Sequence, residues 1–102
     1  MRPAIVVVDM LKDAFKRKNL PSTQEYVKIV PKIKRLLNKA REFNIPIIFA
    51  CDSFLEKDFI FKGKQPYSVR GTEGAEVVED LRPKKKDQIL PKRRFVLREI
   101  FF

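Results

Sequence analysis

The sequence contains no histidine and no tryptophan, and its 102 residues include only one cysteine and three glycines. The single cysteine, Cys51, leaves no second thiol for an internal disulfide. No apolar run approaches the roughly 20 residues that a membrane-spanning helix needs. Met1-Arg2-Pro3 is followed by neither the long apolar core nor the cleavage site of a signal peptide. We therefore expect a soluble, cytoplasmic protein that does not bind a membrane.

Length and composition narrow the class further. A chain of 102 residues supports one domain with a modest core, and 44% hydrophobic with 35% charged residues is typical of a globular chain. Abundant lysine and glutamate with few glycines fits a protein from a thermophile. The net charge of +10 is compatible with an anionic partner. Because the basic residues are spread without a nucleic-acid-binding motif, a general surface bias is favoured over nucleic acid binding.

Three apolar segments predict strands of a parallel sheet. Residues 4–8 end in four consecutive β-branched side chains, which suit a strand buried on both faces. Residues 46–51 form a second such segment, and residues 87–90 a third and shorter one. A strand, a helix and a strand within about fifty residues make a right-handed crossover unit. The sequence therefore predicts an α/β fold with a short parallel sheet and one long crossover helix.

The crossover helix is predicted from the spacing of apolar residues after Pro31. They recur three and four positions apart, as on one helical face: Ile33, Leu36, Leu37, Ala40 and Phe43. Pro31 marks either a kink after a short helix over residues 25–30 or the first turn of the main helix. Ser22 or Thr23 is expected to cap the helical region.

The segments between these elements are expected to be loops and turns. Residues 53–72 form a long loop rich in aromatic side chains, and such loops often shape a pocket or a partner surface. Residues 71–74 are expected to turn, and residues 75–81 to make one or two helical turns before Pro83.

Two acidic residues, Asp9 and Asp52, directly follow the first two predicted strands. Because open α/β sheets bind ligands at the carboxyl ends of their strands, these residues would place two carboxylates at one functional edge. The alternative for Asp9 is a local role as a cap of the next turn or helix. Asp52 could also bind a hard cation weakly with Glu56 and Asp58, although surface acids are the commoner explanation.

Four segments occur in the order seen in the isochorismatase-like cysteine hydrolases. They are I-V-V-V-D-M-L-K-D over residues 5–13, I-I-F-A-C-D-S-F over 47–54, R-G-T-E-G-A-E over 70–76 and P-K-R-R-F over 91–95. The chain resembles that family over most of its length. The resemblance implies part of a three-layer, Rossmann-like α/β fold, and hydrolysis of an amide or vinyl ether of a small-molecule substrate by a Cys-Asp-Lys triad.

By this resemblance Asp9 takes the role of the catalytic Asp and Lys92 that of the catalytic Lys. A carboxylate accepts the proton of a thiol, an ammonium stabilises the resulting anion, and the thiolate attacks a carbonyl carbon. The family's cysteine belongs to its second half, beyond Phe102, and Cys51 is expected to be a buried structural thiol within a strand. We therefore expect one truncated hydrolase domain over residues 1–102 that is inactive alone.

The resemblance also implies pocket residues. Phe15 and Phe95 correspond to substrate-binding aromatic residues. The nicotinamidase branch of the family binds a metal through one Asp and two His, whereas this chain keeps Asp52, has Phe54 at the position of the first His, and contains no His. We therefore expect neither that metal site nor another cofactor.

A three-stranded sheet with one helix has a physical consequence. Apolar faces and at least one sheet edge stay uncovered, so we expect copies of the chain to associate as a homo-oligomer through that edge and residues 96–102. A second interpretation treats the chain as a small basic binding or assembly module for nucleic acid or another anion. In that case Lys92, Arg93 and Arg94 form a solvated basic cluster.

Overall fold

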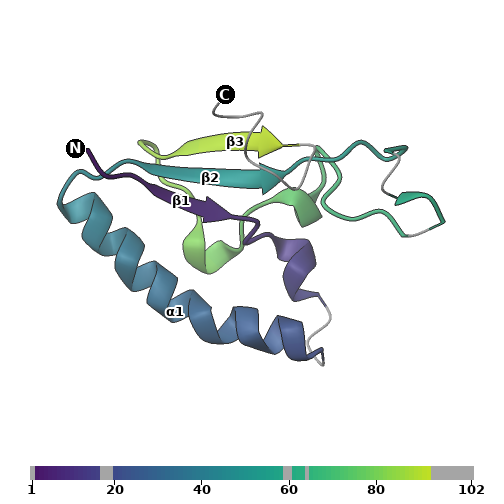
Figure 1. Cartoon of the computed structure of the whole chain (residues 1–102), viewed down its shortest axis with the longest axis horizontal. Helices are drawn as coiled ribbons and strands as arrows, with labels where there is room; N and C mark the ends of the chain where they lie inside the picture. The colour runs from purple at the N-terminus through teal and green to yellow at the C-terminus, as the bar shows by residue number, and fades with distance from the viewer. Residues whose placement is uncertain (1, 17–19, 59–60, 64, 93–102) are drawn as a thin grey trace.

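A computed structural model of the chain describes residues 2–16, 20–58, 61–63 and 65–92. Three parallel strands form its sheet in the order β1-β2-β3: β1 (Ile5–Val8), β2 (Ile47–Asp52) and β3 (Gln88–Lys92). The helix α1 (Pro21–Glu42) connects β1 to β2 (Figure 1). The predicted α/β class, with a short parallel sheet and one long crossover helix, is therefore confirmed.

The helix begins ten residues before Pro31. Pro21 occupies its first turn, where a missing N–H costs nothing, and Leu20 is the N-cap residue without a side-chain hydrogen bond. The expected caps are therefore wrong, and Thr23 instead donates its hydroxyl to the Ala14 carbonyl at 3.4 Å. Pro31 lies inside α1, whose ribbon changes direction near its midpoint in Figure 1, as expected for a helix that continues past a proline.

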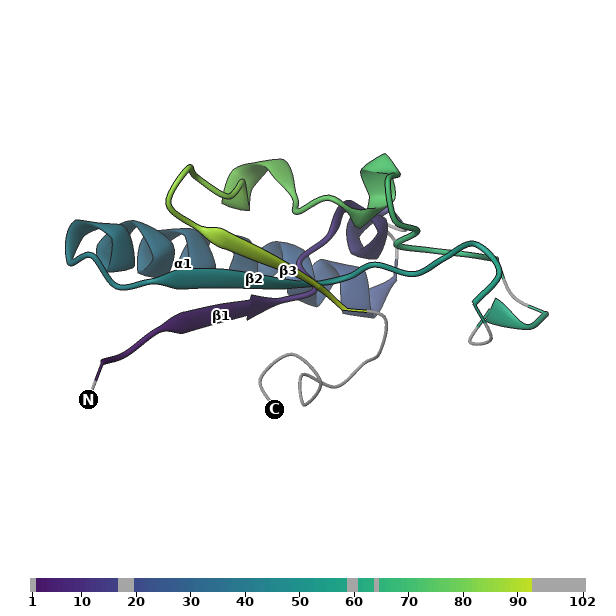
Figure 2. The ribbon, with the colours of Figure 1, turned by 90° about the horizontal axis from the view of Figure 1, so that it is seen from above.

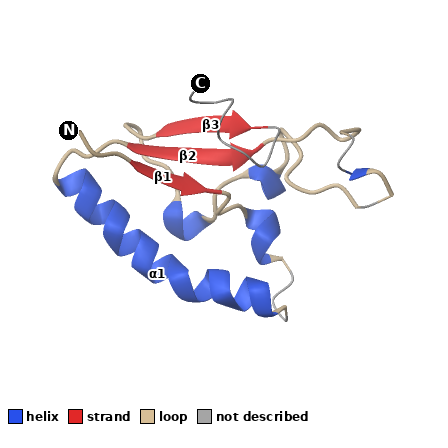
Figure 3. Cartoon of the chain, viewed as in Figure 1, coloured by secondary structure: helices blue, strands red, loops and turns tan. Residues whose placement is uncertain are grey.

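Short 3₁₀ turns replace the expected helix over residues 75–81. These are η3 (Glu73–Ala75) and η4 (Glu79–Leu81), and a third 3₁₀ turn, η1 (Lys12–Phe15), follows β1; Figure 3 draws all three as short helical segments. Between η3 and η4 the chain is extended, because Val77 forms an antiparallel bridge with Leu11 and is buried in the core. Among the described residues, no helix has both the length and the apolar character needed to cross a membrane.

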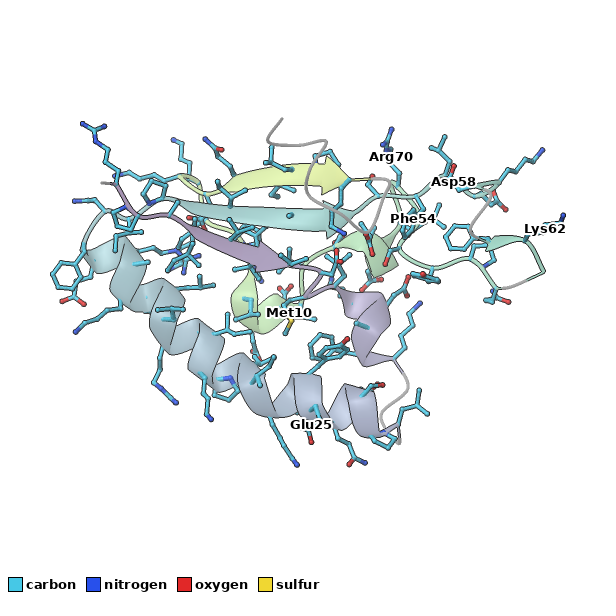
Figure 4. The ribbon with its side chains drawn as sticks, viewed as in Figure 1. Met10, Glu25, Phe54, Asp58, Lys62 and Arg70 are labelled. Atoms are coloured by element: carbon cyan, nitrogen blue, oxygen red, sulfur yellow. The ribbon has the colours of Figure 1, made fainter. Side chains whose placement is uncertain are left out.

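The core lies between one face of the sheet and α1. Side chains that alternate along the strands pack against the helix in one buried cluster, which includes Val7, Ile47, Phe49, Cys51, Val30, Leu37 and Ala40. Figure 4 shows Met10, also buried in this cluster, between the end of β1 and α1. The predicted helical face is only partly right, because Leu36 and Phe43 are 54% and 62% exposed. The buried stripe instead includes Val30, which precedes the proline.

The other face of the sheet is open over β1. Val6 and Val8 are 37% and 43% exposed, so the expectation that this strand is buried on both faces is wrong. The physical reason is visible in Figures 1 and 2, where α1 covers one side of the sheet only. In the described part of the chain, β1 and β3 also each pair with β2 alone, which leaves one free edge on each.

Candidate active site

Three charged residues meet at the carboxyl edge of the sheet. Asp9 directly follows β1, while Asp52 and Lys92 end β2 and β3 and are paired in register. The Lys92 Nζ atom lies 2.9 Å from Asp9 Oδ2 and 2.6 Å from Asp52 Oδ1. The structure thus brings Asp9 and Lys92 into direct contact although 83 positions separate them. We call these three residues the Asp9–Asp52–Lys92 cluster.

Asp9 is held in an unusual backbone conformation. Its φ of 58° lies in the left-handed region, which is disfavoured for residues other than glycine but tolerated best by aspartate and asparagine. The Asp9 N–H donates to the Ala50 carbonyl at 3.0 Å, and Asp9 Oδ1 accepts the Asp52 N–H at 2.9 Å. The carboxylate therefore binds the neighbouring strand and does not cap η1, whose N-cap is Leu11. Such surrounding contacts maintain local strain at functional sites.

Burial makes this cluster electrostatically unusual. The side chain of Lys92 is 2% exposed, that of Asp52 9% and that of Asp9 31%. Burial opposes the charged form of Lys92, but its hydrogen bonds to both carboxylates outweigh that effect and raise its pKa. Burial raises the pKa of Asp52, and the nearby Asp9 charge adds to the shift against the pull of Lys92. Two carboxylates around one ammonium carry a net negative charge, so the cluster can take up a proton.

Cys51 is separated from this chemistry. It is 6% exposed and belongs to the core between the sheet and α1. Adjacent side chains of a strand point to opposite faces, so Cys51 points away from the face to which Asp52 points. Burial, with a smaller contribution from the Asp9 charge, raises the pKa of the Cys51 thiol to about 11. The thiol is therefore protonated near neutral pH and is a poor nucleophile.

A cavity of about 840 Å³ adjoins the cluster. Its lining includes three carboxylates and two phenol rings, those of Asp9, Asp13, Asp52, Tyr26 and Tyr67. Lys92 does not line it and lies behind the two carboxylates that it contacts. Cavities of this size, with a few convergent polar groups, are typical of small-molecule sites.

The predicted aromatic residues have different positions. Phe15 packs against Tyr26 with ring centroids 5.9 Å apart and contacts the core, whereas Tyr26 itself lines the cavity. A contact of Phe15 with substrate stays a prediction, and Phe95 lies outside the described residues.

The long loop over residues 53–72 contributes one wall of the cavity through Tyr67. This agrees with the expectation that the loop shapes a pocket. The Tyr67 ring packs edge-on against Phe54 and Phe61, with centroids 5.7 and 5.1 Å away. In Figure 4, Phe54 lies near the base of the loop, whereas Lys62 points away from the sheet and the helix. Phe54 is therefore a packing residue of the loop.

Tyr26 and Asp13 are among the lining residues that sequence reasoning missed. Tyr26 was not singled out because the apolar spacing was read only after Pro31, although a short helix over residues 25–30 was one of the two alternatives; its place in the first turns of α1 would have been the signal. Asp13 was noted only as part of a motif, and its contacts join segments that are far apart along the chain.

Comparisons with known proteins show what this chain is similar to. The model of the isochorismatase domain matches residues 3–97. Among solved structures, the N-carbamoylsarcosine amidase of Thermoplasma acidophilum is similar with a TM-score of 0.79 and 30% identity over 91% of this chain. The pyrazinamidase of Pyrococcus horikoshii, solved in complex with zinc, gives 0.68 and 30% over 87%. The nicotinamidase of Bacillus subtilis gives 0.74 and 26% over 98%. No curated protein matches the chain.

This chain spans about half the length of several of these structures. It covers 53% of the amidase, 50% of the pyrazinamidase and 66% of the nicotinamidase. The expected isochorismatase-like architecture is confirmed for the part that the chain spans.

The zinc of the pyrazinamidase has no fitting set of donors among the residues that the structure describes. The sequence contains no histidine, and Asp52 is bound to Lys92. Within the described ranges, no three metal-binding side chains gather in one place. A zinc site built from nitrogen and oxygen ligands therefore does not fit these residues.

Proposed function

This chain belongs to the isochorismatase family, and on that basis we propose that the Asp9–Asp52–Lys92 cluster is the acid–base part of a hydrolase site. The substrate would be a small amide or vinyl ether bound in the adjoining cavity. The names of the similar structures, which are amidases, support the amide class. The observation that carries the proposal is the buried Lys92 ammonium between two carboxylates beside that cavity.

Each member of the cluster has a role in this chemistry. Asp9 is the most exposed of the three and accepts the proton of an attacking thiol. The sulfur then bonds to the carbonyl carbon, the carbonyl oxygen becomes an anion, and the proton leaves with the amine when the C–N bond breaks. Water hydrolyses the thioester that remains. Lys92 stabilises the anionic species. The Asp52 carboxylate holds Lys92, and the Asp52 N–H orients the Asp9 carboxylate.

The thiol has to come from outside the described residues. Cys51 is buried on the opposite face and its pKa is about 11, which argues against it as the nucleophile. We therefore propose that the residues described here are inactive alone and act together with a polypeptide segment that carries a reactive cysteine.

The interpretation as a basic binding module has less support. It rested on the net charge alone, and Lys92, which it would place in a solvated cluster, is 2% exposed and bound to two carboxylates. Exposed lysines such as Lys84, Lys85 and Lys86 contribute to that charge, and they do not line the cavity.

Ammonia release from nicotinamide, pyrazinamide and N-carbamoylsarcosine tests the proposal. The chain alone is expected to give no turnover. Production together with the part of the Thermoplasma amidase that this chain does not span is expected to give turnover. Asp9→Asn and Lys92→Met should abolish that turnover, whereas Cys51→Ser serves as the control that leaves it unchanged.

Binding to the chain alone provides a second arm of the test. Nicotinamide should change the fluorescence of the two tyrosines that line the cavity, and Asp9→Asn should weaken this binding. Turnover by the chain alone that Cys51→Ser abolishes would contradict the proposal. So would the absence of both binding and complemented turnover.

A further inference from the structure

Asp13 lies in η1, four positions after Asp9, and its carboxylate is enclosed by the chain. Its side chain is 14% exposed. Asp13 Oδ2 accepts the Ser68 N–H at 2.7 Å, and Asp13 Oδ1 lies 2.6 Å from Lys16 Nζ. Burial alone disfavours its ionised form, but the contacts with Lys16 and Ser68 outweigh burial and lower the pKa of Asp13. A charged group therefore connects η1 to the long loop.

Gly74 makes room for this carboxylate. A Cβ atom at that position would overlap the carboxylate atoms of Asp13. Gly74 is buried in η3, and the adjacent backbone holds η1 in place, because the Lys12 N–H donates to the Glu76 carbonyl at 2.9 Å. The close approach explains why the turn carries a glycine here, since any side chain would displace Asp13.

Ser68 is held from two sides. Its φ of 47° lies in the left-handed region, which is disfavoured for serine, and it is 5% exposed. Its N–H donates to Asp13, and its carbonyl accepts the Phe54 N–H at 3.0 Å. A hydrogen bond to a charged acceptor is stronger than a neutral one, so it offsets the cost of the backbone conformation. Asp13 thus fixes the backbone directly after Tyr67.

Tyr67 stands next to the proposed reacting groups. It lines the same cavity as Asp9 and Asp52. Burial raises the pKa of Tyr67, and the charges of Asp52 and Asp9 raise it further, as expected for a phenol near both carboxylates. A shift of the loop backbone at Ser68 would therefore move an aromatic wall relative to the Asp9–Asp52–Lys92 cluster.

We infer that Asp13 is a positioning residue, which fixes the cavity wall at Tyr67 through the Ser68 N–H and a close contact with Gly74. The inference rests on the proposed function only in taking this cavity as the substrate site. The position of the cavity wall can be tested without measuring turnover. A failure of the inference about Asp13 therefore does not imply a failure of the proposed function, or the reverse.

Tyrosine fluorescence gives a direct test, because the chain has two tyrosines and no tryptophan. In a Tyr26→Phe background, Tyr67 is the sole emitter. Asp13→Ala is expected to raise the acrylamide quenching constant of Tyr67 about two-fold, and Asp13→Asn, which keeps an oxygen acceptor, should raise it less. Glu73→Gln removes an acidic charge from an 82% exposed neighbour of Gly74 and is the matched control, expected to leave quenching unchanged.

The amide signal of Ser68 provides a second readout by NMR. Its proton shift should follow the titration of Asp13, with a midpoint below the ordinary value of 3.8, and this response should vanish in Asp13→Asn. A role in stability alone would lower the unfolding midpoint of the Asp13 variants without changing Tyr67 quenching.

Gly74→Ala tests the same contact if Asp13→Ala does not fold. It should displace the Asp13 carboxylate, raise Tyr67 quenching and remove the pH response of Ser68. It should also lower the free energy of unfolding of the wild type. Folded Asp13 variants with unchanged Tyr67 quenching would overturn the inference, as would Gly74→Ala with an intact Ser68 response.

Discussion

Lys92 is the residue on which the charged cluster depends. Lys92→Met removes the ammonium and leaves two carboxylates close together in a largely buried place. Breaking a buried ion pair in this way costs about 3 to 5 kcal/mol. We therefore expect a loss of that order in the free energy of unfolding at pH 7, measured by urea denaturation.

A matched change at the surface separates the cluster from the general loss of a lysine. Lys85→Met removes an exposed lysine and is expected to change the unfolding free energy by less than about 0.5 kcal/mol. Equal effects of Lys92→Met and Lys85→Met would contradict the described burial of Lys92.

Cys51 should affect stability at alkaline pH. Its thiol ionises at about 9.0 in the unfolded chain and keeps its proton to about 11 in the folded one. The folded state therefore binds more protons in this window, and stability falls as the pH rises through it. At 1.36 kcal/mol per pKa unit, the fall is roughly 2 to 3 kcal/mol.

Cys51→Ala removes this titration. Urea denaturation of both chains between pH 9 and pH 11, the two pKa limits, should show a steeper decline for the wild type. Parallel declines would mean that the thiol is not buried in the native state.

At the residue scale, the sequence predicted what adjacent positions determine. Asp9 was noticed because it directly follows an apolar strand segment, whereas Lys92 was singled out only through the resemblance of its motif to the family. Asp13 and Tyr26 were not, because the contact of Asp13 with Ser68 spans 55 positions and Tyr26 depends on where the helix begins. Such contacts follow from tertiary packing, which no local pattern contains.

At the element scale, α1 contains a proline, Pro31, whose replacement should stabilise the helix. Pro31 lacks an N–H and its ring opposes the carbonyl four residues earlier, yet its side chain is exposed and packs little. Pro31→Ala should stabilise the chain by about 1 to 3 kcal/mol in urea denaturation. Lys34→Ala exchanges two good helix formers at an exposed position and should have little effect. Destabilisation by Pro31→Ala would show that the bend is needed for packing.

The same helix shows why element bounds were harder to predict than element types. The apolar spacing after Pro31 identified the helix, but it left open whether Pro31 is a kink or the first turn of the main helix, because proline usually breaks an interior turn. Packing of Val30 and Leu37 against the sheet carries the helix through Pro31. Similarly, β-branched residues predicted β1 correctly, but they do not reveal that Val6 and Val8 stay exposed.

At the scale of the whole molecule, the open sheet face favours self-association. Val6 and Val8 expose apolar side chains next to the edge of β1 that is unpaired within the described ranges. We expect sedimentation to show a homo-oligomer and the double change Val6→Lys with Val8→Lys to weaken it. Leu36→Lys, on the exposed side of α1, is the control and should leave the assembly intact. A folded wild-type monomer at high concentration would contradict this expectation.

The central claim is that Asp9, Asp52 and Lys92 form one electrostatic unit, and a ¹³C NMR titration of the Asp52 carboxyl carbon tests it most directly. The wild-type midpoint should lie above the ordinary value of 3.8. Asp9→Asn should lower it, because a neighbouring negative charge is lost, and Lys92→Met should raise it, because a stabilising ammonium is lost. A midpoint that is the same in all three chains would contradict the account.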